Sequence, residues 1–407
     1  MVNVVFVAPY VLDATNRFLG AMVQVPGADV AVVSSDPLER FPDRIRERLS
    51  GHWRIDDCLD VDQLTAAVAA LQSSRGGVDV LTAILENLQV PMAEVRERLG
   101  LPGMGVVVAE QFRDKARMKA VFEEAGIPCA RNARVDSAAQ ARDIIGRWRQ
   151  PVVVKPLAGM GARNTFRVDD AETMERWLSH SPPTAAVPVL MEEFLVGQEF
   201  SFESVLVDGE LVWHSIGRYD PTPLTVLENP WIQWCIVLPR EISGDEFADI
   251  RDVGTRAVRT LGLSTGLSHL EWFRRVDGSV AISEVGARPP GAQIASLMSW
   301  AHDTDMYAAW ARLVVHGVFD PPERRYAVGA AYLRAQGAGR TITSVTGIDR
   351  VSPETHALVV ESRLPQVGSH AGDTYEGDGY VIVRGADTGE VDDALAEIVS
   401  SIRVECG

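Results

Sequence analysis

Two glutamates in the C-terminal half of the chain, Glu271 and Glu284, could together bind a divalent metal ion. The stretch 269–291 is typical of two β-strands joined by the turn 275–278, because Asp-Gly between β-rich runs is a strong hairpin signal. Carboxylates on paired strands can approach each other across the strands. Hard oxygen ligands of this kind suit Mg²⁺ held against phosphates. The alternative interpretation is a surface hairpin with two exposed acids.

An arginine, Arg288, follows Glu284 by four residues within the loop 286–291. The glycines and prolines of this loop let the backbone approach a ligand closely while they fix its turn. A guanidinium group beside a metal site fits an anionic reacting group. The loop therefore predicts chemistry on a negatively charged group, with a plain loop arginine as the alternative.

A lysine, Lys155, lies near the end of the short apolar strand expected over 151–156, and the glycine-containing loop 157–163 follows. Glycines expose backbone N–H groups and the ammonium group supplies a point charge, which together favour phosphate binding. The loop is not a P-loop, because GxxxxGK[ST] is absent. A glycine turn beside a lysine whose ammonium group reaches solvent is the alternative.

A helix expected over 114–125 brings two more basic residues to one place. Asp114 is its expected N-cap, and a Gly-Ile-Pro sequence ends it. Arg113 and Lys115 stand at its start, where a side chain can project toward a ligand. A solvated basic face is the more usual meaning of such residues.

The stretch 187–202 predicts a strand that runs into Glu192-Glu193-Phe194-Leu195, followed by a second strand that carries Glu199. Backbone groups at such a strand-to-loop hinge can bind the edge of a purine. A carboxylate nearby can accept hydrogen bonds from ribose hydroxyls. As isolated residues, these acids are more often solvated.

The N-terminal part of the chain alternates strand-like and helix-like stretches. Strands are expected over 2–8, 28–34 and 78–85, and helices over 61–71 and 91–99. This alternation predicts a small doubly wound α/β domain. GxGxxG is absent after the first strand, so a dinucleotide-binding domain is not favoured.

The C-terminal part of the chain is rich in strand-like stretches. Strands are expected over 328–334, 341–345 and 380–384, and an amphipathic helix over 391–399 closes the chain. A further helix over 292–301 has one apolar face and is expected to pack in the core.

Composition is that of a globular protein, with 46% apolar and 23% charged residues among 407. That length predicts about three domains. The 39 basic and 56 acidic residues leave a net charge of −17, which argues against a nucleic-acid or anionic-membrane surface as the main partner. The four cysteines lack metal-type spacing and the first residues lack a basic leader, so we expect free thiols in a soluble, cytoplasmic protein.

Four stretches, taken in order, resemble the ATP-grasp carboxylate–amine ligase family, and its L-amino acid (dipeptide) ligase branch most closely. They are RDKARMKAVFEEAGIP, PVVVKPLAGMGARN, VLMEEFLVGQEFSFESVLVDGEL and the pair HLEWF with AISEVGARPPG. Four motifs in the right order are far more specific than any one of them. The resemblance implies an α/β protein with the ATP-grasp fold and an α+β lid. Its implied parts are a doubly wound pre-ATP-grasp domain over 1–105, an ATP-grasp domain over 106–320 with a lid at about 128–195, and a strand-rich capping domain over 321–407.

The resemblance also implies roles at the phosphates and the metal. Lys115 and Lys155 match the lysines that contact ATP phosphates in this family. Glu271 and Glu284 match its paired metal ligands. Arg288 matches the arginine that steadies the acyl phosphate and its tetrahedral successor, so Arg288 and Lys155 are the implied catalytic residues.

The nucleotide itself would be held by two further segments. The implied flap over the triphosphate contains Gly159, Met160 and Gly161. The implied adenine hinge contains Glu192, Glu193, Phe194 and Leu195. Glu199 is the implied ribose ligand.

One position departs from the family pattern Glu-x-Asn-x-Arg. The chain has Glu284-Val285-Gly286-Ala287-Arg288, so the amide oxygen of the asparagine is missing as a metal ligand. Water can fill that place, because Mg²⁺ keeps several waters readily. The number of metal ions, one or two, stays open.

The implied activity is ATP-dependent amide or peptide bond formation through an acyl phosphate, with release of ADP and phosphate. It would use Mg²⁺, or Mn²⁺ in its place, and join amino acids or an amino acid and a small acid. A biotin-carboxylase-like or purine-biosynthetic ligase is the alternative, and a nucleotide-binding module without catalysis is another. The expected partners are small molecules, not nucleic acid or membrane, with a homodimer as one option.

Overall fold

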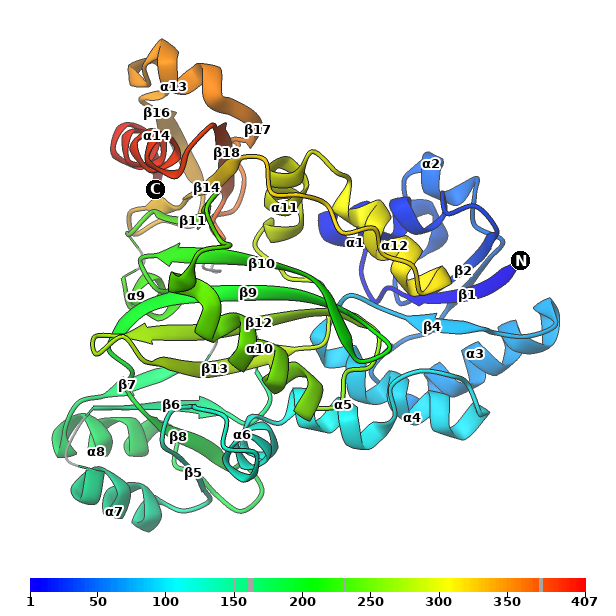
Figure 1. The fold of residues 1–407 in the computed structure, drawn as a ribbon, viewed down its shortest axis with the longest axis horizontal. Helices are drawn as coiled ribbons and strands as arrows, with labels where there is room; N and C mark the ends of the chain where they lie inside the picture. The colour runs from blue at the N-terminus through cyan, green and yellow to red at the C-terminus, as the bar shows by residue number, and fades with distance from the viewer. Residues whose placement is uncertain (149–150, 160–163, 230, 373–375) are drawn as a thin grey trace.

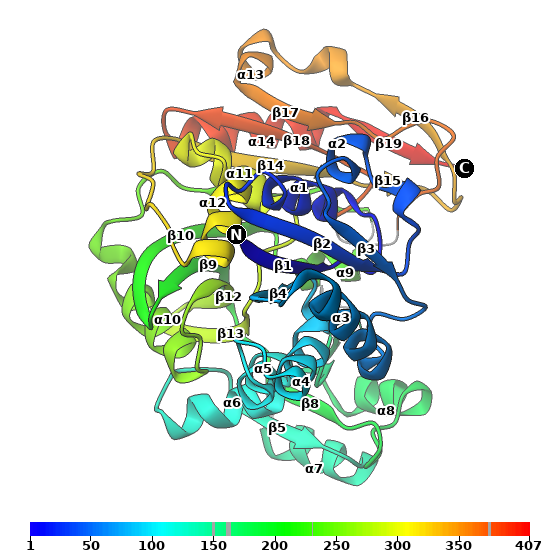
Figure 2. The same ribbon diagram turned by 90° about the vertical axis from the view of Figure 1, so that its right-hand side faces the viewer.

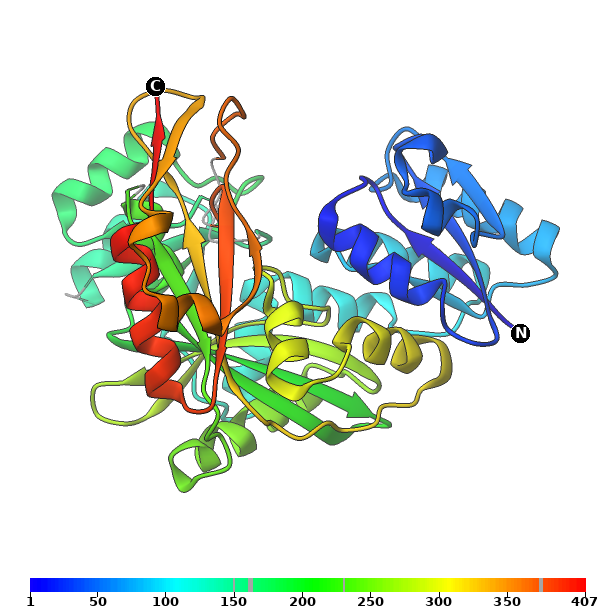
Figure 3. The same ribbon diagram turned by 90° about the horizontal axis from the view of Figure 1, so that it is seen from above.

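The structure is a computed structural model of the chain. It describes residues 1–148, 151–159, 164–229, 231–372 and 376–407. An N-terminal α/β unit, a small four-stranded unit and a large eight-stranded sheet make up most of the molecule (Figure 1). Seen from above, the N-terminal unit lies to one side and the C-terminal helix α14 (Thr388–Ser401) to the other (Figure 3). Within the described ranges, no helix is long and apolar enough to cross a membrane.

The N-terminal unit is a parallel sheet in the order β3-β2-β1-β4, with helices on both faces. Its elements are β1 (Val2–Val7), α1 (Asp13–Met22), β2 (Ala28–Ser34), α2 (Asp43–Arg46), β3 (Gly51–Arg54), α3 (Val61–Arg75), β4 (Val80–Thr82) and α4 (Gln89–Leu99). Alternate residues of β1 face opposite sides, so that Val4 and Phe6 pack toward α1 while Val5 and Val7 pack toward α3 and α4. The predicted doubly wound arrangement is confirmed.

The strand expected over 78–85 is wrong in its length. Only Val80–Thr82 pairs, because β4 is an edge strand that meets β1 for three residues before the chain leaves the sheet. The buried apolar residues that follow pack without a strand partner, and a 3₁₀ turn, Glu86–Leu88, leads into α4. This turn brings Glu86 to the carboxyl ends of the parallel strands, the edge of an open α/β sheet where ligands commonly bind.

Two helices, α5 (Val106–Arg113) and α6 (Lys115–Glu124), follow the N-terminal unit. The carboxylate of Asp114 accepts hydrogen bonds from the N–H groups of Ala116 and Arg117 at 2.8 and 3.0 Å. It thereby satisfies two donors that the first turn of α6 leaves without a helical partner. The predicted helix and its cap are confirmed, and Lys115 is the first helical residue.

The small unit is an antiparallel sheet in the order β5-β8-β6-β7, with two helices packed against it. Its elements are β5 (Asn132–Val135), α7 (Ala138–Trp148), β6 (Val152–Pro156), β7 (Phe166–Val168), α8 (Ala171–His180) and β8 (Val189–Glu193). In the register of β6 and β8, Val153 lies opposite Glu192 and Lys155 opposite Leu190. Lys155 and Glu192 therefore stand on neighbouring strands of one small sheet.

The large sheet runs in the order β13-β12-β9-β10-β11-β14-β18-β17. Its strands are β9 (Gly197–Val207), β10 (Glu210–Asp220), β11 (Trp234–Leu238), β12 (Gly266–Arg275), β13 (Val280–Gly286), β14 (Ala327–Leu333), β17 (Val359–Arg363) and β18 (Gly379–Gly385). Helix α10 (Ala248–Thr260) packs on one face through an apolar cluster that also includes Phe202 and Trp272. Helices α11 (Ile294–His302) and α12 (Met306–His316) pack on the other face, together with α1.

The C-terminal segment extends this sheet. Its strands β14, β18 and β17 continue the large sheet beyond β11, and α14 covers them. The remaining elements are α9 (Pro223–Glu228), β15 (Ala335–Gln336), β16 (Ile342–Thr346), α13 (Pro353–Leu358) and β19 (Arg403–Cys406), of which the three strands form a separate small sheet. Figure 2 shows this segment and the four-stranded unit on opposite sides of the N-terminal unit.

Candidate nucleotide and metal site

Glu271 and Glu284 are direct cross-strand partners in the antiparallel pair of β12 and β13. Their side chains therefore project from the same face, at the edge of the large sheet. The hairpin predicted from Asp277-Gly278 is confirmed, with Gly278 in the left-handed region at a φ of 84°. The structure thus brings together the two carboxylates that the sequence singles out as metal ligands.

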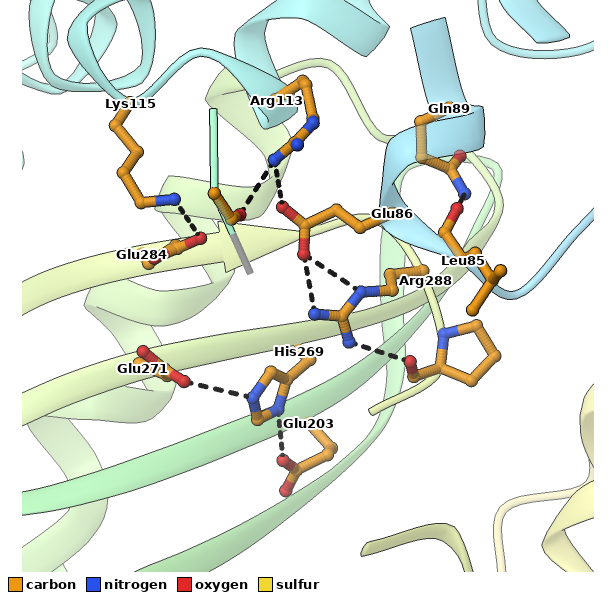
Figure 4. Close-up of polar contacts among 12 residues, drawn as sticks. Leu85, Glu86, Gln89, Arg113, Lys115, Glu203, His269, Glu271, Glu284 and Arg288 are labelled. Atoms are coloured by element: carbon orange, nitrogen blue, oxygen red, sulfur yellow. Dashed lines mark hydrogen bonds and ion pairs between the residues drawn. The ribbon is translucent and has the colours of Figure 1, made fainter. Parts of the chain in front are cut away.

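Lys115 contacts one of these carboxylates. Its Nζ donates to Oε1 of Glu284 at 2.6 Å (Figure 4). Burial would raise the pKa of Glu284, but the positive charges of Lys115 and Lys155 outweigh burial and lower this pKa to about 2. Glu284 is therefore ionised at neutral pH and can act as a hard oxygen ligand.

Lys155 and a third lysine, Lys119, hold the two oxygens of Glu192. Lys155 forms an ion pair with Oε2 of Glu192, and Nζ of Lys119 lies 3.0 Å from Oε1. Lys119 is fully buried and also donates to the carbonyl of Ile282 at 3.0 Å. Burial would raise the pKa of Glu192, but the two lysines lower it. Both oxygens of Glu192 therefore lie against lysines, and its backbone lies within the sheet between β5 and β6.

Lys115, Lys119 and Lys155 are the three lysines of the whole chain, whose 39 basic residues are otherwise arginines. All three contact acidic side chains at this site. An ammonium group is a compact point charge, whereas a guanidinium group is planar and larger. Sequence reasoning missed Lys119, although this count and its spacing of four residues from Lys115 on one helix are the signals that could have found it.

The segment predicted as the hinge continues beyond β8, where the chain passes from the small sheet to the large sheet. The N–H of Glu193 donates to the carbonyl of Arg131 at 2.8 Å, and the N–H of Phe194 donates to that of Pro151 at 2.9 Å. Within the described residues, the N–H of the half-buried Leu195 has no backbone acceptor. In the segment predicted as the adenine hinge, Leu195 thus has an N–H group without a backbone acceptor in the described residues.

Glu199 is buried on β9, on the same face of the sheet as Glu271. Burial and the nearby charges of Glu271 and Glu284 raise its pKa well above the usual value. A carboxyl group can accept hydrogen bonds from hydroxyl groups, which is the role that the sequence predicts for Glu199 at a ribose.

Arg288 contacts a residue that sequence reasoning missed. Its Nη2 and Nε donate to Oε2 of Glu86 at 2.7 and 3.2 Å, and Nη1 of Arg113 donates to Oε1 of the same carboxylate at 2.9 Å (Figure 4). Arg113 also donates to the carbonyl of Gly159 at 2.9 Å. The signal in the sequence was a glutamate just beyond an expected strand of a parallel sheet, where binding residues gather.

A buried histidine also lies beside the metal carboxylates. Nδ1 of His269 lies 2.9 Å from Oε1 of Glu203, and its Nε2 lies 3.6 Å from Oε1 of Glu271. Burial would lower the pKa of His269, but the hydrogen bond to Glu203 and the negative charges of Glu203 and Glu271 raise it to about 9. His269 is therefore an imidazolium cation between two carboxylates at neutral pH. The alternation His-x-Glu along one strand was the signal for this pair.

The flap is described only in part. Gly159 lies in the loop that follows β6, within the described residues. Met160 and Gly161 lie outside the described residues. Among the described residues, no group of three or more His, Cys, Asp or Glu side chains could hold a metal ion. An ion on Glu271 and Glu284 would thus take its remaining ligands from phosphate oxygens and water, which is how Mg²⁺ commonly binds.

Comparison with known proteins accounts for this arrangement. Residues 113–216 match the family model described as the ATP-grasp (A) domain of phosphoribosylglycinamide synthetase. That range contains Lys115, Lys155 and the hinge. The chain has the ATP-grasp fold. The resemblance inferred from its motifs is confirmed, and so is the predicted fold class.

The chain is similar to several ligases. It is 27% identical to the alanine–anticapsin ligase of Bacillus subtilis over 237 residues, which are 53% of this chain and 49% of that enzyme. The chain thus spans about half the length of that relative. The crystal structure of an L-amino acid ligase from Bacillus licheniformis matches with a TM-score of 0.78 and 17% identity, covering 100% of this chain and 99% of that one.

A more distant neighbour was solved with nucleotide and metal. The biotin carboxylase domain of the Hydrogenobacter thermophilus 2-oxoglutarate carboxylase, in complex with MgADP, ADP and bicarbonate, matches with a TM-score of 0.70 and 14% identity. The match covers 99% of this chain and 90% of that one. At this identity the neighbour establishes a shared fold.

Proposed function

We propose that the chain is an ATP- and Mg²⁺-dependent ligase that forms an amide or peptide bond between amino acids, or between an amino acid and a small acid. The observation that carries the proposal is that Glu271 and Glu284 face each other at the edge of the large sheet, while the charges of Lys115, Lys155 and Arg288 all act on Glu284. The names of the similar ligases, which refer to alanine and to L-amino acids, support the substrate class.

The nucleotide would lie between the small and the large sheet. The N–H of Leu195 would bind the adenine edge, and the carboxyl group of Glu199 would bind the ribose hydroxyls. Lys115 and Lys155 would contact the phosphates. Gly159, Met160 and Gly161 belong to the loop proposed to cover them.

The residues present fit a magnesium ion. Glu271 and Glu284 would hold it, and the hard oxygen atoms of both carboxylates suit this ion. When bound, the metal would neutralise charge on the phosphates and orient them. Gly286 supplies no ligand, so water or phosphate would complete the shell.

In the proposed reaction, a carboxylate oxygen of the acid attacks the γ-phosphorus of ATP, the bond to the β–γ bridging oxygen breaks, and ADP leaves. An uncharged amine then attacks the carbonyl carbon of the acyl phosphate. Orthophosphate leaves from the tetrahedral intermediate, and the proton that the amine gives up leaves with it as hydrogen phosphate. No protein nucleophile takes part, so the chain contributes positioning and charge.

Lys155 must leave Glu192 to reach a phosphate, because its ammonium group contacts that buried carboxylate in this structure. Lys119 stays on the other oxygen of Glu192 and keeps the charge paired. The guanidinium group of Arg288 would stabilise the negative charge that develops on the acyl phosphate and on the tetrahedral intermediate.

The test is phosphate release from ATP and Mg²⁺ with pairwise pools of amino acids and simple amines, followed by mass spectrometry of the product. The proposal predicts release that requires both an acid and an amine, with ADP as coproduct. Labelled bicarbonate in place of the amino acids separates the biotin-carboxylase-like alternative. Nucleotide binding by calorimetry without phosphate release from any pool would contradict the proposal. Light scattering on the same samples tests the homodimer that is part of it.

A further inference from the structure

Glu86 holds two arginines that come from different parts of the chain (Figure 4). Oε1 of Glu86 accepts from Nη1 of Arg113 at 2.9 Å, and Oε2 accepts from Nη2 and Nε of Arg288 at 2.7 and 3.2 Å. The side chain of Glu86 is 5% exposed and that of each arginine 17%. Two hydrogen bonds from one guanidinium group, largely shielded from water, fix both its position and the direction of its plane.

The turn that carries Glu86 is itself anchored. The N–H of Leu88 donates to the carbonyl of Leu85 at 3.2 Å, and the side chain of Leu88 is fully buried. Arg96 of α4 donates to the carbonyl of Leu81 in β4 at 2.6 Å. These contacts hold the turn against the sheet, so Glu86 has a fixed position from which it holds Arg288.

Arg113 gives the same carboxylate a second function. It stands at the end of α5 and donates to the carbonyl of Gly159 as well as to Glu86. One carboxylate thus connects the loop of Arg288 with the start of the loop after β6.

We infer that Glu86 is a positioning residue, through which the N-terminal unit holds Arg288 in the orientation that the reaction needs. This inference rests on the proposed ligase function, in which Arg288 stabilises the acyl phosphate and its tetrahedral successor. Without Glu86, Arg288 would lose the two hydrogen bonds that set the direction of its guanidinium plane, although its Nη1 also donates to the carbonyl of Pro289 at 3.0 Å. Its charge would then meet the reacting group in a fraction of molecules, and small misplacements of this kind reduce rates strongly.

The variant Glu86→Gln keeps the shape of the side chain and removes its charge. We expect kcat to fall about 30-fold and the KM for ATP to change by less than about threefold, because Arg288 acts in the transition state. Positional exchange of ¹⁸O in labelled ATP, measured with the acid and without the amine, should fall by a similar factor. Glu86→Asp keeps the charge and should recover part of kcat.

The matched control is Glu361→Gln. Glu361 accepts from Arg17 at 2.8 Å, and this ion pair also connects the N-terminal unit to another part of the chain. The control makes the same chemical change at a second contact of the N-terminal unit. We expect its kcat to stay within about twofold of wild type. Equal losses in the two variants would mean that Glu86 only docks the N-terminal unit, which would overturn the inference.

A readout independent of turnover separates this inference from the proposed function. The Nε–H signal of Arg288 in ¹⁵N NMR, assigned by its loss in Arg288→Lys, should be protected from solvent exchange in wild type and unprotected in Glu86→Gln. Unchanged protection would overturn the inference even in an active ligase. If only the KM for the amine rose while ¹⁸O exchange kept its rate, Glu86 would bind the amine and the inference would fail. A wild-type protein that releases no phosphate fails the proposed function, while the NMR result still decides the role of Glu86.

Discussion

The ammonium group of Lys119 lies 3.0 Å from the carboxylate of Glu192, and both side chains are buried. Removing one partner of such a pair leaves the other as an uncompensated buried charge. We therefore expect Lys119→Met to lower the free energy of unfolding by about 3 kcal/mol. Urea denaturation followed by circular dichroism measures this change.

Lys119→Met should also raise the KM for ATP. With Lys119 gone, Lys155 is the remaining partner of Glu192 and is held away from the phosphates. The matched control is Arg142→Met, which breaks the exposed pair of Arg142 and Glu175 in the small unit. That control should leave both stability and KM nearly unchanged. A Lys119→Met protein with wild-type stability would show that the buried ion pair contributes little to the free energy of unfolding.

His302, at the end of α11, predicts a pH dependence of stability. Its Nδ1–H donates to the carbonyl of Met298 at 2.7 Å, and its Nε2 accepts from Nε of Arg324 at 3.2 Å, so the ring is neutral. Burial and the charge of Arg324 lower the pKa of His302 to about 3. In the unfolded chain, His302 binds a proton below about pH 6.5. In the folded chain, it stays neutral until the pH falls to about 3.

The stability that neutral His302 supports is thus present above pH 6.5 and is lost as the pH falls toward 3. Between pH 7 and pH 5, wild type should lose about 2 kcal/mol more than His302→Gln, whose amide can make similar hydrogen bonds. Chemical denaturation at a series of pH values checks this difference. The control His180→Gln, on the exposed end of α8, should follow the wild-type curve. Parallel curves for wild type and His302→Gln would contradict the prediction.

Because Glu271 and Glu284 lie opposite each other, we expect both to affect how turnover depends on the Mg²⁺ concentration. Glu271→Gln and Glu284→Gln should each lower turnover by about 100-fold at saturating ATP, because each removes one anionic oxygen ligand. Turnover measured over a Mg²⁺ titration should also show half-saturation at a higher concentration. Glu210→Gln, which changes an exposed glutamate on β10, serves as the control. If one of the two site variants kept wild-type Mg²⁺ dependence, the metal would be held elsewhere.

Arg288 predicts a separation of kcat from KM. Arg288→Ala should lower kcat by about 100-fold and raise the KM for ATP far less, because the charge that it stabilises develops in the transition state. Steady-state kinetics with varied ATP measures both constants. A variant with unchanged kcat and weaker ATP binding would place Arg288 on the nucleotide instead.

Those parts of the fold and site that depend on local sequence could be predicted. The turn at Asp277-Gly278 and the alternation along two strands placed Glu271 opposite Glu284. The cap at Asp114 placed Lys115 at the start of a helix. Each of these depends on residues close in sequence, where turn chemistry and periodicity determine geometry.

The contacts between distant segments could not be predicted. Glu86 and Arg288 are 202 residues apart, and their contact depends on how the edge strand β4 ends and how the N-terminal unit packs. The strand expected over 78–85 was too long, and the turn that carries Glu86 was not predicted. Buried apolar residues outside a sheet have the same sequence pattern as a strand. Glu192 likewise contacts Lys155 because β6 pairs with β8, a register that the sequence does not state, and it contacts Lys119 from the distant helix α6.

The formation of an acyl phosphate is the central chemical step of this account, and oxygen transfer tests it directly. The acid substrate is prepared with ¹⁸O in its carboxylate, and the phosphate released during ligation is analysed by mass spectrometry. Because the acyl phosphate forms by attack of a carboxylate oxygen on phosphorus, one ¹⁸O atom should appear in the released phosphate. Ligation product with unlabelled phosphate, or with the label in AMP, would contradict the account.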